Sequence, residues 1–369
     1  MITDADVLAA VAAHESDARD AMEFVHGHPE LAHAELRCSR FLTDQLMRKG
    51  LDVELGVGGM DTAFTATVQG TRPGRSVGIV CLYDAVQTIR ENGEIEAVHS
   101  CGHGVISGSV VAAALALADH REQLAGKLVI VGCPADEIHA AGTVARGGGK
   151  ALSVEAGLWD EIDVGLYSHP EFIDTVSLES RWMRRERVRL DGGRDLSGEL
   201  EAPLRAAQAV IGANDLDVMV EHLEFDGDVE SETSMTMQAD LLLFADTEAE
   251  LEARCATARA TVPNGTWTSG ITYRGVRPND AVTATVREAF AAAGRGFEPN
   301  PPALPFATDF GNISHAVPAA LIGVGRPDGW AFHTDLGREQ FTSEAGFEAA
   351  IATARVLALS AARLTEPLS

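Results

Sequence analysis

The segment VGIVCLYD, residues 77–84, is a run of mostly apolar side chains that ends in an aspartate. Three similar runs follow it along the chain: KLVIVGC (127–133), DVGLYSH (163–169) and AALIGVG (319–325). Continuous apolar runs of this length are typical of central strands that helices cover on both faces. Helical patterns lie between and around these runs, and the longest spans residues 343–364. The sequence therefore predicts the α/β class, with a doubly wound, mixed sheet.

The pattern changes between residues 186 and 277. Strand-like and helical segments follow one another there in the order β-α-β-β-α-β, which is typical of a small α+β domain. The α/β pattern then resumes and continues to the end of the chain. We therefore expect a larger domain formed by residues 1–185 and 278–369, with a smaller domain, residues 186–277, inserted into it.

Composition and charge exclude several classes of protein. The 369 residues are 46% hydrophobic and 23% charged, and the net charge is −26. Such a negative field repels nucleic acid and anionic membrane surfaces. The arginines of RWMRRERVRL (181–190) form the one basic patch; they either recognise an anion or coat the solvent face of a strand.

Localisation and the state of the cysteines are predicted from what the sequence lacks. There is no run of eighteen apolar residues and no basic-then-apolar leader, so we expect a cytoplasmic protein without a membrane span. Five cysteines form an odd set without framework spacing, which predicts free thiols in a reducing compartment.

Residues that bind metals follow the predicted strands at their carboxyl ends. In open α/β sheets these ends meet at one edge, so we expect the side chains to converge there. Two of the residues stand in the stretch HSCGHG (99–104), directly before an apolar helix. The converging set is Asp84, Cys101, His103, Asp136, Glu137, His169 and His333.

The five strongest metal ligands of this set are too many for one catalytic zinc ion, which keeps three protein ligands and an open position. They suit two divalent ions that share a ligand. Imidazole and thiolate favour zinc or cobalt, and the carboxylate also admits manganese. Simpler interpretations stay open at this point: Cys101 as a small buried residue, His169 as a turn residue before Pro170, and Glu137 as part of a solvated loop. His139 is left unassigned.

Eight motifs in a fixed order resemble those of the di-metal peptidase and amidohydrolase family of aminoacylases and carboxypeptidases, in the amidohydrolase branch near aminobenzoyl-glutamate hydrolase. The resemblance covers the chain almost end to end, apart from the inserted segment. The motifs are HGHPELAHAE (26–35), GVGGMDTAFTATVQG (56–70), LYDAV (82–86), HSCGHG (99–104), CPADE (133–137), YSHPE (167–171), ATDFGNISHAVP (307–318) and AFHTD (331–335).

The resemblance implies a role for each of these residues. Asp136 would be the general base and Asp84 would orient a ligand, while Asp309 and Asn312 would line the substrate pocket. The inserted domain would act as a lid and form a homodimer. The implied ligands of two divalent ions are Cys101, His103, Glu137, His169 and His333.

Three departures from the family pattern affect the expected chemistry. Asp136-Glu137 stands where relatives carry Glu-Glu, the segment 189–203 lacks the histidine of the family's lid, and DAVQ (84–87) replaces Asp-Ala-Leu-Pro. We expect a metal-dependent hydrolase that cleaves the C–N (amide) bond of a small N-acyl or aminoacyl substrate, with a metal-bridging water as nucleophile. Hydrolytic deamination of an aromatic amine by the same site, or metal binding without turnover, are the alternatives.

Overall fold

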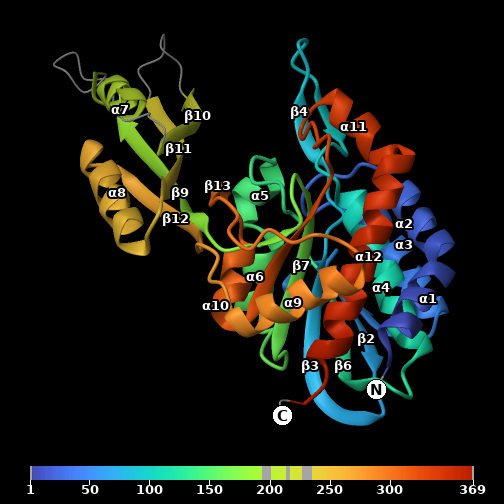
Figure 1. Cartoon of the computed structure of the whole chain (residues 1–369). Helices are drawn as coiled ribbons and strands as arrows, with labels where there is room; N and C mark the ends of the chain where they lie inside the picture. The colour runs from blue at the N-terminus through green and yellow to red at the C-terminus, as the bar shows by residue number, and fades with distance from the viewer. Residues whose placement is uncertain (1, 193–200, 213–216, 227–234, 368–369) are drawn as a thin grey trace. The chain divides into compact units, whose positions relative to one another are not determined.

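The computed structural model describes residues 2–192, 201–212, 217–226 and 235–367 (Figure 1). The chain forms two compact units. The larger comprises Met1–Glu179, Val276–Ala303 and Asp309–Ser369, and the smaller comprises Ser180–Gly275 and Leu304–Thr308. The smaller unit thus begins earlier than we expected, because its longest strand starts at Ser180, and it also takes in a short strand from a later part of the chain.

The larger unit is built on a seven-stranded mixed sheet with the strand order β1-β2-β6-β3-β7-β14-β8. The four central strands, β6, β3, β7 and β14, run parallel to one another, and the outer strands pair antiparallel. This is the predicted α/β class. The strands are β1 (Asp52–Leu55), β2 (Phe64–Gln69), β3 (Arg72–Cys81), β6 (Ala125–Gly132), β7 (Val164–Glu171), β8 (Thr175–Ser177) and β14 (Ala319–Gly325), with a separate hairpin of β4 (Val86–Ile89) and β5 (Ile95–Val98).

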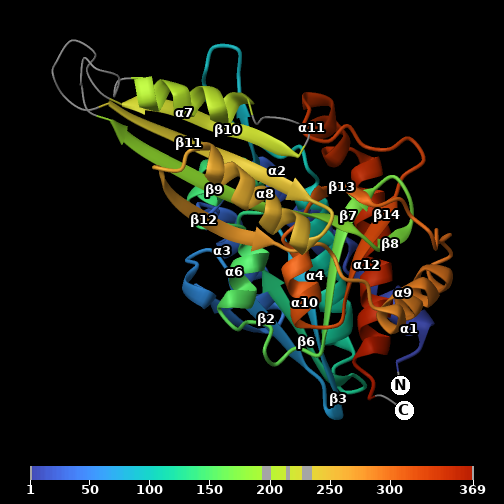
Figure 2. The same cartoon turned by 90° about the vertical axis from the view of Figure 1, so that its left-hand side faces the viewer.

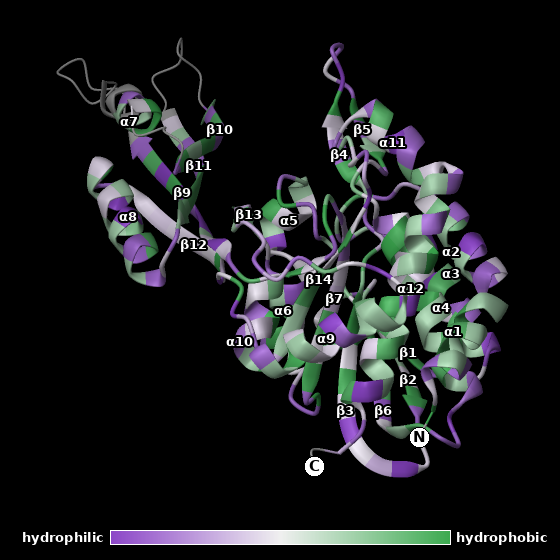
Figure 3. Cartoon of the chain, in the orientation of Figure 1, coloured by the Kyte–Doolittle hydropathy of each residue, from purple (hydrophilic) through white to green (hydrophobic). Residues whose placement is uncertain are grey.

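Helices cover the sheet on both faces, and the sheet lies between the two groups in Figure 1. One group packs around α4 and contacts the central strands, and the other contains α6 and α10. Figure 3 shows the central strands largely in the green of hydrophobic residues. The helices are α1 (Asp4–Ala13), α2 (Glu15–Gly27), α3 (Leu36–Arg48), α4 (His103–Asp119), α5 (Ala141–Arg146), α6 (Gly149–Glu155), α9 (Asp280–Ala292), α10 (Phe310–Ala316), α11 (Asp335–Thr342) and α12 (Glu344–Leu364), with a 3-10 turn at Val57–Gly59.

Helix α4 lies at the centre of the larger unit. Every residue from His103 to Ala118 is buried, because the helix is apolar around its whole circumference. It packs against α2 and α12 as well as the sheet. Gly108 permits the close approach of α2, since a Cβ atom there would lie 2.7 Å from the main-chain oxygen of Ala18.

Helix α12 is the only helix among the described residues that is long and apolar enough to cross a membrane. In the structure, 67% of its apolar window is buried inside the protein. It contacts α4, α9 and α1. These contacts are those of a core helix.

The smaller unit is an antiparallel sheet with the order β10-β11-β9-β12, and helices α7 and α8 pack on β9 and β11 (Figure 2). Its elements follow one another in the predicted order β-α-β-β-α-β, and β13 adds a short parallel pairing to β9. The elements are β9 (Ser180–Gly192), α7 (Glu201–Gly212), β10 (Val218–Asp226), β11 (Met235–Ala245), α8 (Glu248–Thr261), β12 (Thr266–Tyr273) and β13 (Leu304–Ala307).

The arginines of β9 form ion pairs within the smaller unit. Arg181 pairs with Asp217, Arg184 with Glu252, and Arg185, which is only 7% exposed, with Glu221. Arg187 and Arg189 of the same strand also pair with carboxylates, although their side chains are 42% and 57% exposed. Anion recognition and a purely solvent-facing role both stay predictions. Most of the segment 189–203, which lacks the lid histidine, lies outside the described residues.

We predict that Gly108→Ala destabilises the larger unit. A methyl group at this position would press against the backbone of α2, and overpacking of this kind costs about 1–3 kcal/mol, which outweighs the better helix propensity of alanine. Chemical denaturation should show a lower free energy of unfolding. Gly27→Ala serves as the matched control because no atom lies within 4 Å of its Cβ position. Equal stability of the two variants would contradict the packing argument.

Candidate metal centre

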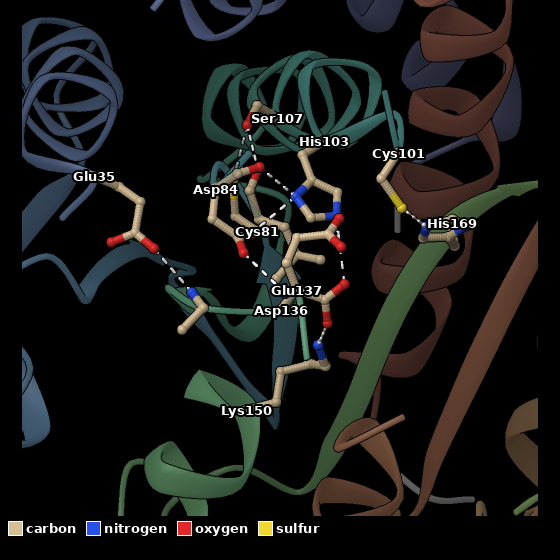
Figure 4. A network of polar contacts seen from close by, with 12 residues as sticks. Glu35, Cys81, Asp84, Cys101, His103, Ser107, Asp136, Glu137, Lys150 and His169 are labelled. Carbon is tan, nitrogen blue, oxygen red and sulfur yellow. Dashed lines mark hydrogen bonds and ion pairs between the residues drawn. The ribbon is translucent and has the colours of Figure 1, made fainter. Parts of the chain in front are cut away.

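The five predicted ligands lie on segments that meet at one edge of the larger unit's sheet. Figure 4 labels Cys101, His103, Glu137 and His169. Glu137 follows β6, and His169 stands near the end of β7. His333 lies in the loop between β14 and α11. Cys101 precedes α4, and His103 is the first residue of that helix. Because β6, β3, β7 and β14 are parallel, their carboxyl ends bring these segments together as the sequence predicts.

The ligand atoms form two groups, in each of which all atoms lie within 4.8 Å of one another. One group is Cys101, His103 and His169, and the other is Cys101, Glu137 and His333. The Sγ atom of Cys101 lies 3.6 Å from Nε2 of His169. The two oxygens of Glu137 face different histidines, each at 3.7 Å: Oε1 faces His103 and Oε2 faces His333. Cys101 is therefore the ligand that the two groups share.

Asp84 orients the buried imidazole of His103. The ring atom Nδ1 donates to the main-chain oxygen of Asp84 at 2.7 Å and lies 2.9 Å from its Oδ1 atom. The other carboxylate oxygen accepts from the main-chain N–H of Glu137 at 3.0 Å. Asp84 follows the end of β3 at Cys81, so it stands beyond the strand that we expected it to close. One buried carboxylate thus holds the ring of His103 and the backbone of Glu137.

The donor atoms fit a divalent metal ion. Nε2 of His103 and Oε1 of Glu137 are buried and have no hydrogen-bond partner among the described residues, although they face each other. Buried polar atoms are rarely left in this state unless a further group joins them. Nitrogen, sulfur and carboxylate oxygen together are ligands that zinc accepts, and cobalt and manganese are compatible with part of the set.

The protonation of the ligands depends on that metal. Burial and the charge of Glu137 raise the pKa of the Cys101 thiol. Burial would lower the pKa of His103, but the nearby carboxylates of Asp84 and Asp136 raise it well above the ordinary value. Burial and the positive charge of His103 lower the pKa of His169 to about 4, so that ring stays neutral. A metal ion held by these residues would displace protons from Cys101 and His103.

The side chain of His333 is about half exposed, so little packing holds it. Its position depends on the backbone. Its φ angle is 59°, a left-handed conformation that few residues other than glycine adopt. The main-chain N–H of His333 donates to the oxygen of Ser100 at 2.9 Å, which ties this loop to the segment HSCGHG. His139, which the sequence left unassigned, is exposed.

Asp136 and Asp309 are joined by a buried lysine that the sequence analysis missed. Lys150, at the start of α6, contacts Oδ1 of Asp136 and lies 2.7 Å from Oδ1 of Asp309. The second oxygen of Asp309 accepts from the main-chain N–H of Ala151 at 3.1 Å, and Asp309 is 1% exposed. Asp309 is thus bonded within the protein, and its expected contact with the substrate stays a prediction. Asn312, on α10, is half-buried.

Glu35 is a second buried residue that the sequence analysis did not single out. Its carboxylate accepts hydrogen bonds from the main-chain N–H groups of His33 at 2.8 Å and Ala135 at 3.0 Å, and from the hydroxyl of Thr62 at 2.8 Å. Burial and the charge of Asp84 raise its pKa to about 7. Ala135 has a φ angle of 59°, so Glu35 holds a strained residue next to Asp136. The sequence feature that could have indicated Glu35 is its place as the last residue of the motif HGHPELAHAE.

Aromatic side chains stand beside the histidine ligands. The ring of Phe332 lies 5.5 Å from that of His169 and 5.9 Å from that of Phe172, measured between centroids. Phe172 is 56% exposed. Phe341 packs behind Phe332 at 5.6 Å and stacks on Trp330 at 4.6 Å. The candidate centre therefore has an aromatic wall, Phe332 and Phe172, that rests on a packed aromatic base.

Residues 83–360 match the model of Peptidase family M20/M25/M40. The match covers most of the chain, which therefore belongs to this family. It includes every predicted ligand and Asp84 and Asp136 as well. The family is that of the resemblance found in the sequence.

Curated relatives include thermostable carboxypeptidase 1 of Saccharolobus solfataricus, which is 28% identical over 38% of this chain, and a subunit of the p-aminobenzoyl-glutamate hydrolase of Escherichia coli, which is 29% identical over 41%. These matches span 35% and 32% of the relatives' own length. Among solved structures, a putative aminohydrolase from methicillin-resistant Staphylococcus aureus has a TM-score of 0.70, with 17% identity and coverage of 99% of this chain and 100% of its own. A dinuclear metal-binding M20 peptidase of Bacillus subtilis has a TM-score of 0.69, with 17% identity and coverage of 97% and 100%. These structures share the fold of this chain.

We predict that Cys101→Ser weakens metal binding. Serine supplies a harder donor that ionises less readily than a thiol, and loss of a ligand should cost at least the tenfold or so in affinity that loss of a supporting contact costs. Calorimetric titration with Zn²⁺ measures the change. Cys255→Ser, in the smaller unit, is the control and should bind like the parent. If the Cys101 variant also keeps the parent's affinity, Cys101 is a structural residue.

Proposed function

We propose that this protein is a metal-dependent hydrolase that cleaves the amide bond of a small N-acyl or aminoacyl substrate. Two divalent ions would be held by Cys101, His103, Glu137, His169 and His333. The observation that carries the proposal is the pair of buried atoms, Nε2 of His103 and Oε1 of Glu137, that face each other at 3.7 Å without hydrogen-bond partners. Amide hydrolysis is also the chemistry that fits the names of the relatives, which include a carboxypeptidase, an N-acetyl-L-cysteine deacetylase and an Xaa-Arg dipeptidase.

The charge of the site supports divalent ions over a single monovalent one. Asp84, Asp136, Glu137 and Asp309 place four carboxylates in one region, and all but Asp136 are buried. Among the described residues, Lys150 is the one permanently charged cation that forms an ion pair with these carboxylates. Uncompensated buried charge is costly, so the region favours further positive charge.

Asp136 is the residue that would move the proton. Bound divalent ions supply Lewis acidity towards the amide carbonyl and lower the pKa of water. Oδ2 of Asp136 lies 3.4 Å from Nε2 of His103, on the metal-facing side of that ring. From there it can accept a proton from the attacking water and pass it to the leaving nitrogen, which is general acid–base catalysis by one carboxyl group.

The function is tested by the release of amine from metal-loaded protein. We expect free amino acid from N-acyl amino acids, and we expect turnover to fall by about 100-fold or more in Asp136→Asn, because general-base catalysis is worth at least that much. Metal content should not change, since the five ligands remain. Release of ammonia from aromatic amines alone would replace amide hydrolysis by deamination. No product from any substrate of either class would leave a metal-binding protein without turnover.

We further propose that the acyl group of the substrate is aromatic. Phe332 precedes His333 in the chain, and its ring lies beside that of His169. The exposed ring of Phe172 packs on Phe332 and extends the aromatic wall towards solvent. Aromatic rings bind one another in offset or edge-to-face arrangements at such distances. An aryl acyl group on this wall would have its carbonyl carbon near the histidine ligands.

Phe332→Ala should therefore discriminate between acyl groups. We expect kcat/KM for an N-benzoyl amino acid to fall about tenfold, since an aromatic pair is worth up to about 1.5 kcal/mol, while kcat/KM for the N-acetyl analogue stays near that of the parent. The acetyl substrate controls for any disturbance of His333, and Leu55→Ala, an exposed residue of β1, controls for loss of surface apolar area. Equal losses on both substrates would contradict the aromatic site.

The smaller unit and the surroundings of the protein remain predictions. We propose that the smaller unit mediates a homodimer, with a second copy pairing along one of its outer strands, β10 or β12. The lack of nucleic-acid or membrane-surface partners is proposed on the net charge of −26. A cytoplasmic location is proposed on the five free cysteines, which suit a reducing compartment.

A further inference from the structure

Lys150 occupies an unusual environment for a lysine. It is 0% exposed, although lysine is among the residues least often fully buried. Its ammonium group contacts Asp136 and Asp309 and lies 5.1 Å from the centre of the Tyr167 ring. An ammonium group has three N–H donors, so two carboxylates and one aromatic face account for its bonding capacity.

The two carboxylate oxygens of Asp136 have different partners. Lys150 donates a hydrogen bond to Oδ1, whereas Oδ2 lies 3.4 Å from Nε2 of His103 (Figure 4). Aspartate is one methylene shorter than the glutamate that the family places here, so its carboxylate reaches less far from the backbone. Free rotation about its side-chain bonds would carry Oδ2 away from the position that proton transfer requires.

Asp309 holds the lysine in place in turn. It bonds Lys150 through Oδ1 and the main-chain N–H of Ala151 through Oδ2, so it joins the ammonium group to the start of α6. Asp309 thus holds the ammonium group of Lys150 in the position from which it contacts Oδ1 of Asp136. Lys150 itself is fully buried and does not touch the solvent from which a substrate would arrive.

We propose that Lys150 is a positioning residue for Asp136: it holds Oδ1 so that Oδ2 faces the metal side of His103, and it thereby compensates for the shorter side chain. This inference rests on the proposed function for its kinetic consequences, but the position of Asp136 can be measured without any activity. Misplacement of a reacting group by about 1 Å can cost about 100-fold in rate. Lys150 acts through Asp136 and makes no contact with the substrate.

The test uses a variant that keeps the charge of the region balanced. Lys150→Ala together with Asp309→Asn removes one cation and one anion, and this avoids leaving an unpaired buried charge that could unfold the protein. We expect kcat to fall by about 10- to 100-fold while KM and metal content stay close to those of the parent. Lys127→Ala, which removes a lysine paired with Glu161 at the surface, is the control and should behave like the parent.

Addition of Asp136→Glu to the same variant distinguishes positioning from a general structural role. The longer carboxylate would use the space that Lys150 leaves and reach the metal side unaided, so most of the lost kcat should return. In the parent background, Asp136→Glu should lower kcat, because the longer side chain would collide with Lys150. If the triple variant is no faster than the double variant, or the double variant does not fold even with metal, Lys150 is a structural residue and the proposal is overturned.

A crystal structure of the double variant with metal tests the inference even if no substrate is hydrolysed. We expect Oδ2 of Asp136 to leave its place beside Nε2 of His103. If Asp136 keeps that place without Lys150, positioning by Lys150 is refuted whatever the protein catalyses. If Asp136 moves but no substrate is turned over by the parent, the proposed function fails and the positioning role stands.

Discussion

The buried contact between Asp84 and His103 is the interaction on which the rest of the site depends. It joins the end of β3 to the first residue of α4, and through the N–H of Glu137 it also holds the loop after β6. Three segments that are distant in sequence are therefore fixed by one carboxylate. Helix α4 can present His103 in this way because its buried, apolar length packs firmly between the sheet and its neighbouring helices.

Around this contact the protein buries more carboxyl groups than it pairs with cations. Burial and neighbouring carboxylates raise the pKa of Glu137 to about 8, and burial and the charge of Asp84 raise that of Glu35 to about 7. A region of this kind stores electrostatic free energy that a divalent ion can release on binding. Two of the segments that carry ligands or Asp136 also contain a residue in the left-handed conformation, Ala135 and His333. The backbone accepts this strain in order to place side chains that regular turns would direct elsewhere.

Much of this architecture was predictable from the sequence. The apolar runs gave central strands because continuous burial leaves few other structures possible, and parallel strand ends had to bring Glu137 and His169 to one edge. The spacing could not predict Lys150, since a lysine in GGGKAL is usually an exposed residue of a helix start, and its partners lie far away in sequence. It also could not predict that Asp309 bonds Lys150, because a motif indicates which loop lies near the site and does not indicate which buried cation a side chain meets.

The central claim is that one set of five ligands holds two divalent ions, with Cys101 common to both groups. Anomalous diffraction from crystals grown with Zn²⁺ locates the ions directly. The account predicts two anomalous peaks per chain. One lies beside His103 and His169 and the other beside Glu137 and His333, and both lie close to the sulfur of Cys101. No peak at these residues, or peaks only at surface carboxylates, would contradict it.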